Sequence, residues 1–152
     1  MMTNKTTKIL LGLAPLLLAG CATNSQLTTG DSIRELAGTS WELLTPHTIS
    51  GNTPKLEKGQ YTITFGDNGQ LFAKLDCNRG SAQWSQNVTS GGAGSLTISP
   101  VAMTKVMCPT GSLDTLLAKQ LQDVRSYSIS DGLLSLSLQP YGDTIIWRPI
   151  RK

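Results

Sequence analysis

The sequence is poor in charge, in aromatic side chains and in histidine. Charged residues make up 15% of the 152 residues, aromatic residues make up 5%, and His47 is the only histidine. A metal site built from several histidines is therefore excluded, and any histidine-dependent catalysis would have to use His47. Basic residues do not form a stripe with interleaved aromatics, so we do not expect a nucleic acid partner.

Long hydrophobic runs are also missing, and the main apolar stretch lies close to the N-terminus. Residues 9–18 are apolar and follow Lys5 and Lys8. A run of about ten residues is too short to span a bilayer. A basic start, a short apolar run and small residues after it are typical of a secretory signal.

The end of this run carries a second signal. Leu18-Ala19-Gly20-Cys21 resembles the lipobox of bacterial lipoproteins, in which the cysteine thiol is diacylated, the chain is cut before it, and the new amine is acylated. Three acyl chains hold a protein firmly, because each buried methylene contributes about 0.8 kcal/mol. Ala22 follows, where Asp would favour inner-membrane retention, so we expect an outer-membrane lipoprotein facing the periplasm. An ordinary signal with a coincidental cysteine and an N-terminal membrane helix are the alternatives.

These signals divide the chain into three parts. We predict a lipoprotein signal peptide at 1–20, a lipidated flexible tether at 21–34 and one domain at 35–152. Removal of the signal takes Lys5 and Lys8 with it and leaves 11 basic and 10 acidic residues, a net charge of about +1. The remaining chain is long enough for a core of its own, and we expect a monomer without a cofactor.

Two further cysteines, Cys77 and Cys108, suit an oxidising compartment. A disulfide between them would close a loop of about 30 residues, which the chain-entropy model values at about 3.5 kcal/mol. A metal site and two free thiols are the rival interpretations. A metal site would need further cysteine or histidine ligands, so we expect no metal.

Alternating apolar and polar residues predict antiparallel strands and two hairpins. Asp131-Gly132 suits a type I′ turn that pairs Ile129 with Leu134 and Tyr127 with Leu136. A three-residue loop at 67–69 pairs Phe65 with Leu71, Ile63 with Ala73 and Tyr61 with Leu75, which keeps one face apolar. Other predicted strands cover 39–44, 80–85, 95–99, 101–106 and 144–148. Polar stretches at 45–60 and 85–94 are predicted to be mobile loops.

One helix is predicted, with its leucines on a single stripe. Its apolar residues are Leu113, Leu116, Leu117, Leu121 and Val124, with Ser112 as N-cap and Asp114 in the first turn. We expect this helix to plug the open end or face of the sheet. The predicted fold class is mainly β (α+β), a small antiparallel β-barrel-like sheet with one packed α-helix.

Three stretches carry a resemblance to a known family. Residues 36–43 (LAGTSWEL), 76–80 (DCNRG) and 104–109 (TKVMCP) resemble the META/HslJ-like domain, and 111–127 is similar to its lipoprotein branch. Many members have glycine before the first cysteine, where this chain has Asp76. The resemblance implies a small antiparallel barrel-like fold with a packed helix. It also implies links to heat shock, novobiocin tolerance and envelope upkeep, and it supplies no catalytic residues.

The residues themselves also argue against an enzyme. His47 lies beside Pro46 in a Thr-, Gly- and Pro-rich stretch typical of a solvated loop, and the carboxylates are scattered over turn positions. Gly91-Gly92-Ala93-Gly94 lacks the lysine and following helix of a phosphate-binding loop. We therefore expect no catalysis.

Two binding functions remain. The first is a protein-binding module for envelope maintenance, such as an escort for an outer-membrane protein. The second is a carrier of a small apolar ligand, a lipid or a hydrophobic drug such as novobiocin, held by an aromatic set that core packing would explain equally: Trp41, Tyr61, Phe65, Phe72, Trp84 and Trp147. Asn78 and Arg79 are candidate binding residues, since Arg79 at a clamped turn could contact an anionic partner. The alternative is that both are ordinary turn residues.

Overall fold

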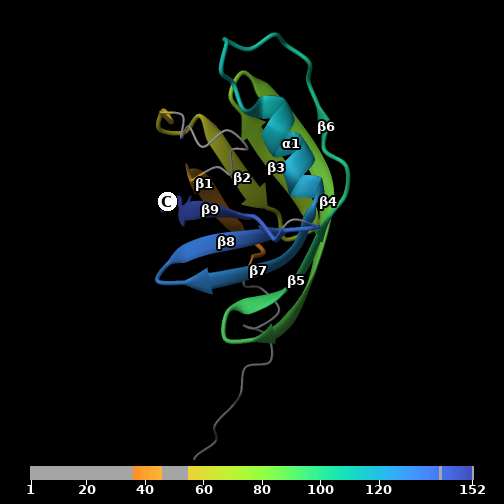
Figure 1. Cartoon of the computed structure of the whole chain (residues 1–152). Coiled ribbons are helices and arrows are strands. Elements are labelled where there is room, and N and C mark those ends of the chain that lie inside the picture. Colours follow the sequence, from red (N-terminus) through yellow and green to blue (C-terminus); the bar gives the residue numbers. More distant parts are fainter. Residues whose placement is uncertain (1–35, 46–54, 141, 152) are drawn as a thin grey trace, which may run out of the picture.

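The computed structural model describes residues 36–45, 55–140 and 142–151. They form a closed antiparallel barrel with one short helix (Figure 1). The predicted fold class is therefore confirmed. The elements in chain order are β1 (Thr39–Thr45), β2 (Tyr61–Phe65), β3 (Gln70–Leu75), β4 (Asn78–Ser90), β5 (Ala93–Ile98), β6 (Ala102–Met103), α1 (Asp114–Gln122), β7 (Val124–Ser130), β8 (Leu133–Leu138) and β9 (Thr144–Pro149).

Eight of the strands close on themselves. Neighbours follow the order β3-β2-β1-β9-β8-β7-β5-β4, and β4 pairs again with β3. The two-residue β6 pairs with β4 beside the barrel wall. Closure gives every strand of the eight-stranded wall a neighbour on both sides over part of its length, which reduces the exposed edges that lead to edge-to-edge aggregation.

Both predicted hairpins have the predicted register. In β2–β3, Phe65 lies opposite Leu71 and Tyr61 opposite Leu75, and Gly69 has a φ of 77°. In β7–β8, the turn residues Asp131 and Gly132 have φ values of 53° and 75°. Positive φ at both positions is what a type I′ turn requires. The short loops therefore determine the register of both strand pairs.

The predicted mobile loop at 85–94 is wrong. This stretch contains the second half of β4 and the start of β5, paired from Trp84 opposite Ile98 to Ser90 opposite Ala93. Gly91 and Gly92, with φ values of 53° and 80°, make the turn between them. Backbone pairing needs no apolar side chains on the outer face, so polar Ser, Gln, Asn and Thr residues are compatible with a long hairpin here.

The predicted strand at 101–106 is also too long. Only Ala102 and Met103 pair with β4, opposite Ser81 and Gly80. Thr104 makes one further backbone bond to β4, donating to the carbonyl of Arg79. After Thr104, the side chain of Asn78 on β4 bonds the backbone of Val106. Within the described residues, the backbone of β4 makes no further bonds to this segment, so the strand pairing ends here.

Large apolar side chains of the barrel strands and of α1, together with Leu36, form one core. Several of them are less than 2% exposed: Leu36, Ile63, Phe65, Leu71, Leu75, Leu96, Leu117, Leu121, Leu134, Leu136, Ile145 and Trp147. Of the predicted aromatic set, Trp41, Tyr61, Phe65 and Trp147 are buried, and Trp84 is half-buried with its ring against Phe65. Phe72 is 49% exposed, so core packing does not explain it. It follows Leu71 on a strand whose inward positions are Leu71 and Ala73, and alternation therefore turns it outward.

The helix α1 contacts β3 and β5, and its Leu117 and Leu121 are fully buried. Figure 1 shows the helix beside β3. It ends earlier than predicted, because Val124 already begins β7. Its N-cap residue is Leu113, not Ser112, whose hydroxyl accepts only a long bond of 3.4 Å from the Asp114 amide. The Leu113 amide instead donates to the Tyr61 hydroxyl at 2.9 Å. Among the described residues, no helix has the length and hydropathy that a membrane span requires.

Candidate functional site

The candidate site lies at the end of the barrel where β3 turns into β4. Cys77 is the second residue of this turn and forms a disulfide with Cys108, with Cα atoms 5.5 Å apart. The bond connects the start of β4 to the segment that precedes α1. The disulfide therefore joins two parts of the chain that no backbone ladder connects.

The turn itself explains the glycine that the resembling family has before this cysteine. Asp76 has a φ of 59°, in the left-handed region. Glycine occupies this region without steric cost, and Asp is among the few other residues that tolerate it. The replacement of glycine by Asp76 therefore leaves the turn geometry intact.

Asn78 is the centre of the hydrogen-bond network at this site. It is 1% exposed. Its amide nitrogen donates to the Val106 carbonyl and to the Asp114 carboxylate, both at 2.9 Å, and lies 3.3 Å from the sulfur of Cys108. Its amide oxygen accepts from the Val106 amide and the Thr104 hydroxyl, both at 2.8 Å. We call Asn78 and these four partners the Asn78 clamp.

The clamp holds an apolar loop tip in place. Val106 is 59% exposed and Met107 is 95% exposed, although Asn78 bonds both backbone groups of Val106. When a loop is flexible, its apolar side chains usually fold back onto the protein and leave water. Here the disulfide and the amide network restrain the backbone while the two side chains face solvent.

A surface groove lies beside this tip. It has a volume of about 520 Å³, opens widely to solvent, and is lined by Phe72, Arg79, Gly80, Ser81, Ala102, Met103 and Thr104. Gly80 makes the close approach of β6 possible, because a Cβ there would lie 2.7 Å from Val101 Cγ1 and 3.1 Å from the Ala102 carbonyl oxygen. We call this the β4–β6 groove.

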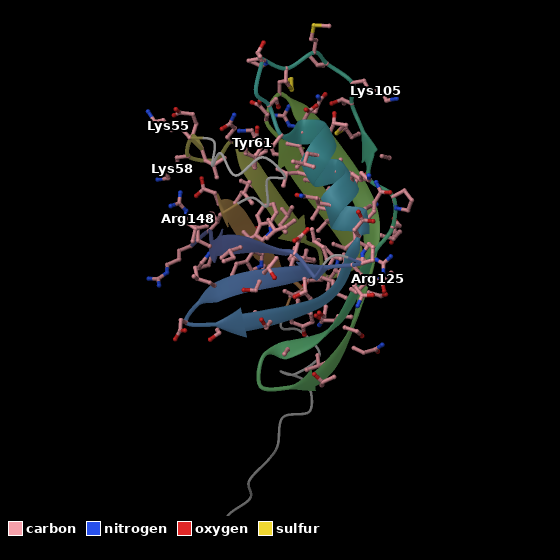
Figure 2. All side chains as sticks on the ribbon, in the orientation of Figure 1. Lys55, Lys58, Tyr61, Lys105, Arg125 and Arg148 are labelled. Atoms are coloured by element: carbon pink, nitrogen blue, oxygen red, sulfur yellow. A yellow bond between two sulfur atoms is a disulfide. The ribbon has the colours of Figure 1, made fainter. Side chains whose placement is uncertain are left out.

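Glu42 and Arg148 form an ion pair near the same end of the barrel. The Arg148 Nε donates to the Glu42 carboxylate at 2.9 Å, and the Gly59 amide donates to the other carboxylate oxygen. Burial raises the pKa of Glu42, but hydrogen bonds from Arg148 and Gly59 and the charges of Arg148 and Lys58 outweigh it. The pKa of Glu42 is therefore lowered from its ordinary value of 4.5. Figure 2 shows Arg148 and Lys58 on the same side of the molecule.

The structure separates the two candidate binding residues. Asn78 is buried and directs its amide to the chain's own groups, whereas Arg79 is exposed and lines the β4–β6 groove. Cys21 and His47 lie outside the described residues. Within the described ranges, no group of three or more His, Cys, Asp or Glu side chains could hold a metal ion.

Sequence reasoning missed Phe72 and Met107 as exposed apolar residues and Asp114 as a partner of Asn78. The predicted register already places Phe72 on the outer face of β3, and this signal could have identified it. The contact between Asn78 and Asp114 joins residues 36 positions apart, and no local pattern predicts it.

Two solved structures are similar to the chain. A protein from Burkholderia xenovorans, determined by NMR, matches with a TM-score of 0.61 at 16% identity and covers 99% of this chain and 100% of its own. A DUF4847 family protein from Bacteroides vulgatus matches with a TM-score of 0.46 at 14% identity, over 74% of this chain and 92% of its own. The first similarity supports the fold alone. No curated protein matches.

A family assignment comes from the sequence. The profile of the META domain matches residues 34–148, which is most of the chain. This range contains the barrel, the helix, the disulfide and the groove. The chain therefore belongs to the META domain family.

Proposed function

We propose that this chain is a lipoprotein held at Cys21 in the outer membrane, with its META domain in the periplasm. The domain binds a protein of the cell envelope without catalysing a reaction, and this binding helps to maintain the envelope under stress. The lipobox-like sequence before Cys21 supports the anchor, and the resemblance to the lipoprotein branch supports the setting. The surface of the domain supports the binding role.

The observation that carries this proposal is the restrained apolar tip. Val106 and Met107 are 59% and 95% exposed on a segment held by the Asn78 clamp and the disulfide. Exposed apolar side chains on an ordered backbone are characteristic of protein contact sites, since a partner can bury them without first ordering the loop.

The carrier function has less support. A carrier of a lipid or an apolar drug needs an internal cavity, typically of about 300–1,000 Å³. The inward positions of the barrel strands are instead filled by large side chains such as Trp147, Phe65 and Leu136, each less than 2% exposed. This packing favours a partner that binds outside the barrel.

Photocrosslinking from the tip tests the binding role. A photoreactive amino acid replaces Met107 in the acylated protein in membranes, and the matched control places it at Thr97, an exposed residue of β5. We expect one envelope protein to crosslink at position 107 and not at position 97. Equal crosslinking at both positions, or none at either, would contradict the proposal.

The anchor has its own test. Cys21→Ser removes the acylated thiol, and we expect the domain to move from the membrane fraction to the soluble periplasmic fraction. A variant that stays in the membrane would contradict lipid anchoring. Mass spectrometry of the wild-type amino end checks the acylation directly.

A further inference from the structure

The β4–β6 groove combines an apolar floor with a single charge. Phe72, Ala102 and Met103 supply the apolar lining, and Arg79 is the one charged residue among the groove-lining residues. The side chain of Phe72 is 49% exposed. The groove opens widely to solvent, so an extended peptide segment has access to its whole length.

Two further basic residues lie close to Arg79, one across the sheet and one along the chain. Lys74 lies directly opposite Arg79 across the β3–β4 ladder, and Lys105 follows the groove residue Thr104. Lys74 turns its ammonium toward the Gly59 carbonyl, 2.6 Å away. Asp76, two residues after Lys74, is the nearest acidic residue along the chain.

Arg79 is available to a ligand. It is exposed, and the described part of the chain shows no ion pair or hydrogen bond for its guanidinium. Its backbone, in contrast, is held by Thr104, since its amide donates to the Thr104 hydroxyl and its carbonyl accepts from the Thr104 amide. An exposed guanidinium without a partner can form two parallel hydrogen bonds with a carboxylate.

We propose that the β4–β6 groove binds an acidic segment of a protein partner, with a carboxylate on Arg79 and an adjacent apolar side chain over Phe72 and Met103. This inference rests on the proposed protein-binding function and names the chemistry of the partner. An acidic segment with a neighbouring apolar side chain matches both the single positive charge and the apolar lining of the groove.

The test measures binding of short fluorescent peptides to the full mature protein. One peptide has a Glu-Phe-Glu-Leu core, and two matched peptides replace both Glu residues with Gln or with Lys. We expect the Glu peptide to bind at least about tenfold more tightly than the Gln peptide, with an affinity that falls as salt rises. Equal affinity for the Glu and Gln peptides would overturn the proposal.

Charge-reversal variants locate the site. Arg79→Glu should weaken binding of the Glu peptide at least about tenfold and strengthen binding of the Lys peptide. Lys119→Glu, on the exposed side of α1, is the matched control and should change the affinity less than about twofold. An equal effect of both variants would overturn the assignment. Because Arg79 is exposed, its variant should unfold at the wild-type denaturant concentration, which checks the fold.

Further outcomes distinguish a wrong class of partner, a wrong groove and a wrong contact site at the tip. Vesicles containing phosphatidylglycerol that bind through Arg79, while the Glu peptide does not, would overturn a protein partner for the groove. A crosslink at position 107 that survives Arg79→Glu, together with no peptide binding, would leave the proposed function standing and overturn the groove. Peptide binding without any crosslink at position 107 would instead contradict the tip as the contact site.

Discussion

At the scale of single residues, Asn78 holds parts of the chain that are far apart in the sequence. Its two amide atoms bond Thr104, Val106 and Asp114, which belong to the loop and to the first turn of α1. A buried amide with all its bonds made stabilises one arrangement, and each lost partner leaves an unpaired polar group. Asn78 is therefore a structural residue of the site, and Arg79 next to it faces the groove.

We predict that Asn78→Ala lowers the free energy of unfolding by about 3 kcal/mol, because several buried groups lose their partner at once. Chemical denaturation of both proteins measures the difference. Arg79→Ala is the neighbouring control, and we expect a change within about 0.5 kcal/mol. Similar values for the two variants would mean that the amide network contributes little.

Glu42 gives a prediction on pH. Its pKa is lowered in the folded state from 4.5, so the charged form stabilises the fold above that pH. The stabilisation is lost as pH falls below 4.5 through the lower folded pKa. We expect Glu42→Gln to cost about 1–2 kcal/mol at pH 7, and the difference from wild type to shrink toward pH 3. Denaturation at both pH values measures it, and a constant difference would contradict the ion-pair explanation.

At the scale of elements, the β4–β5 hairpin depends on a glycine that packs against backbone. Gly94 lies opposite Val88 on β4 and Tyr127 on β7. A Cβ at Gly94 would lie 2.2 Å from the carbonyl oxygen of Asn87. Backbone atoms cannot move aside as a flexible side chain can, so the strands would have to separate.

We therefore predict that Gly94→Ala destabilises the domain by about 2–3 kcal/mol. Ser95→Ala, at the next position on the exposed face of β5, should stay within about 0.5 kcal/mol. Thermal unfolding of the two variants compares them. A tolerated alanine at position 94 would show that the two strands can move apart at little cost.

Elements with local signals were predictable, and those held by distant contacts were not. The turn residues at 67–69 and 131–132 determine the β2–β3 and β7–β8 registers, and both were predicted. The 85–94 hairpin was missed, because its outer residues are as polar as those of a loop. The start of α1 was misplaced, since its amide partner is the Tyr61 hydroxyl, 52 residues away.

At the scale of the whole molecule, the barrel closes through strands from both ends of the domain. β1 pairs with β9, where Glu42 meets Arg148 across 106 positions. The disulfide adds a second long-range restraint at the end of the barrel that carries the tip. The core lies inside the closed strands, so the fold does not need the disulfide to bury its apolar side chains.

We predict that Cys77→Ala together with Cys108→Ala lowers the free energy of unfolding by about 3 kcal/mol and leaves the barrel folded. Circular dichroism should report native strand content, and amide hydrogen exchange should rise between residues 104 and 112 and stay low in β7 and β8. An unfolded double variant, or unchanged exchange in the loop, would contradict this division between barrel and tip.

The sequence by itself determined which side of the β2–β3 and β7–β8 strands is buried, where their short turns lie and which family the domain resembles, because these properties depend on residues close together in the chain. The tertiary structure decided how the barrel closes, that Asn78 is buried while Arg79 is exposed, and that a groove forms beside Phe72. These features arise from contacts between segments tens of residues apart, and their energies depend on the folded geometry.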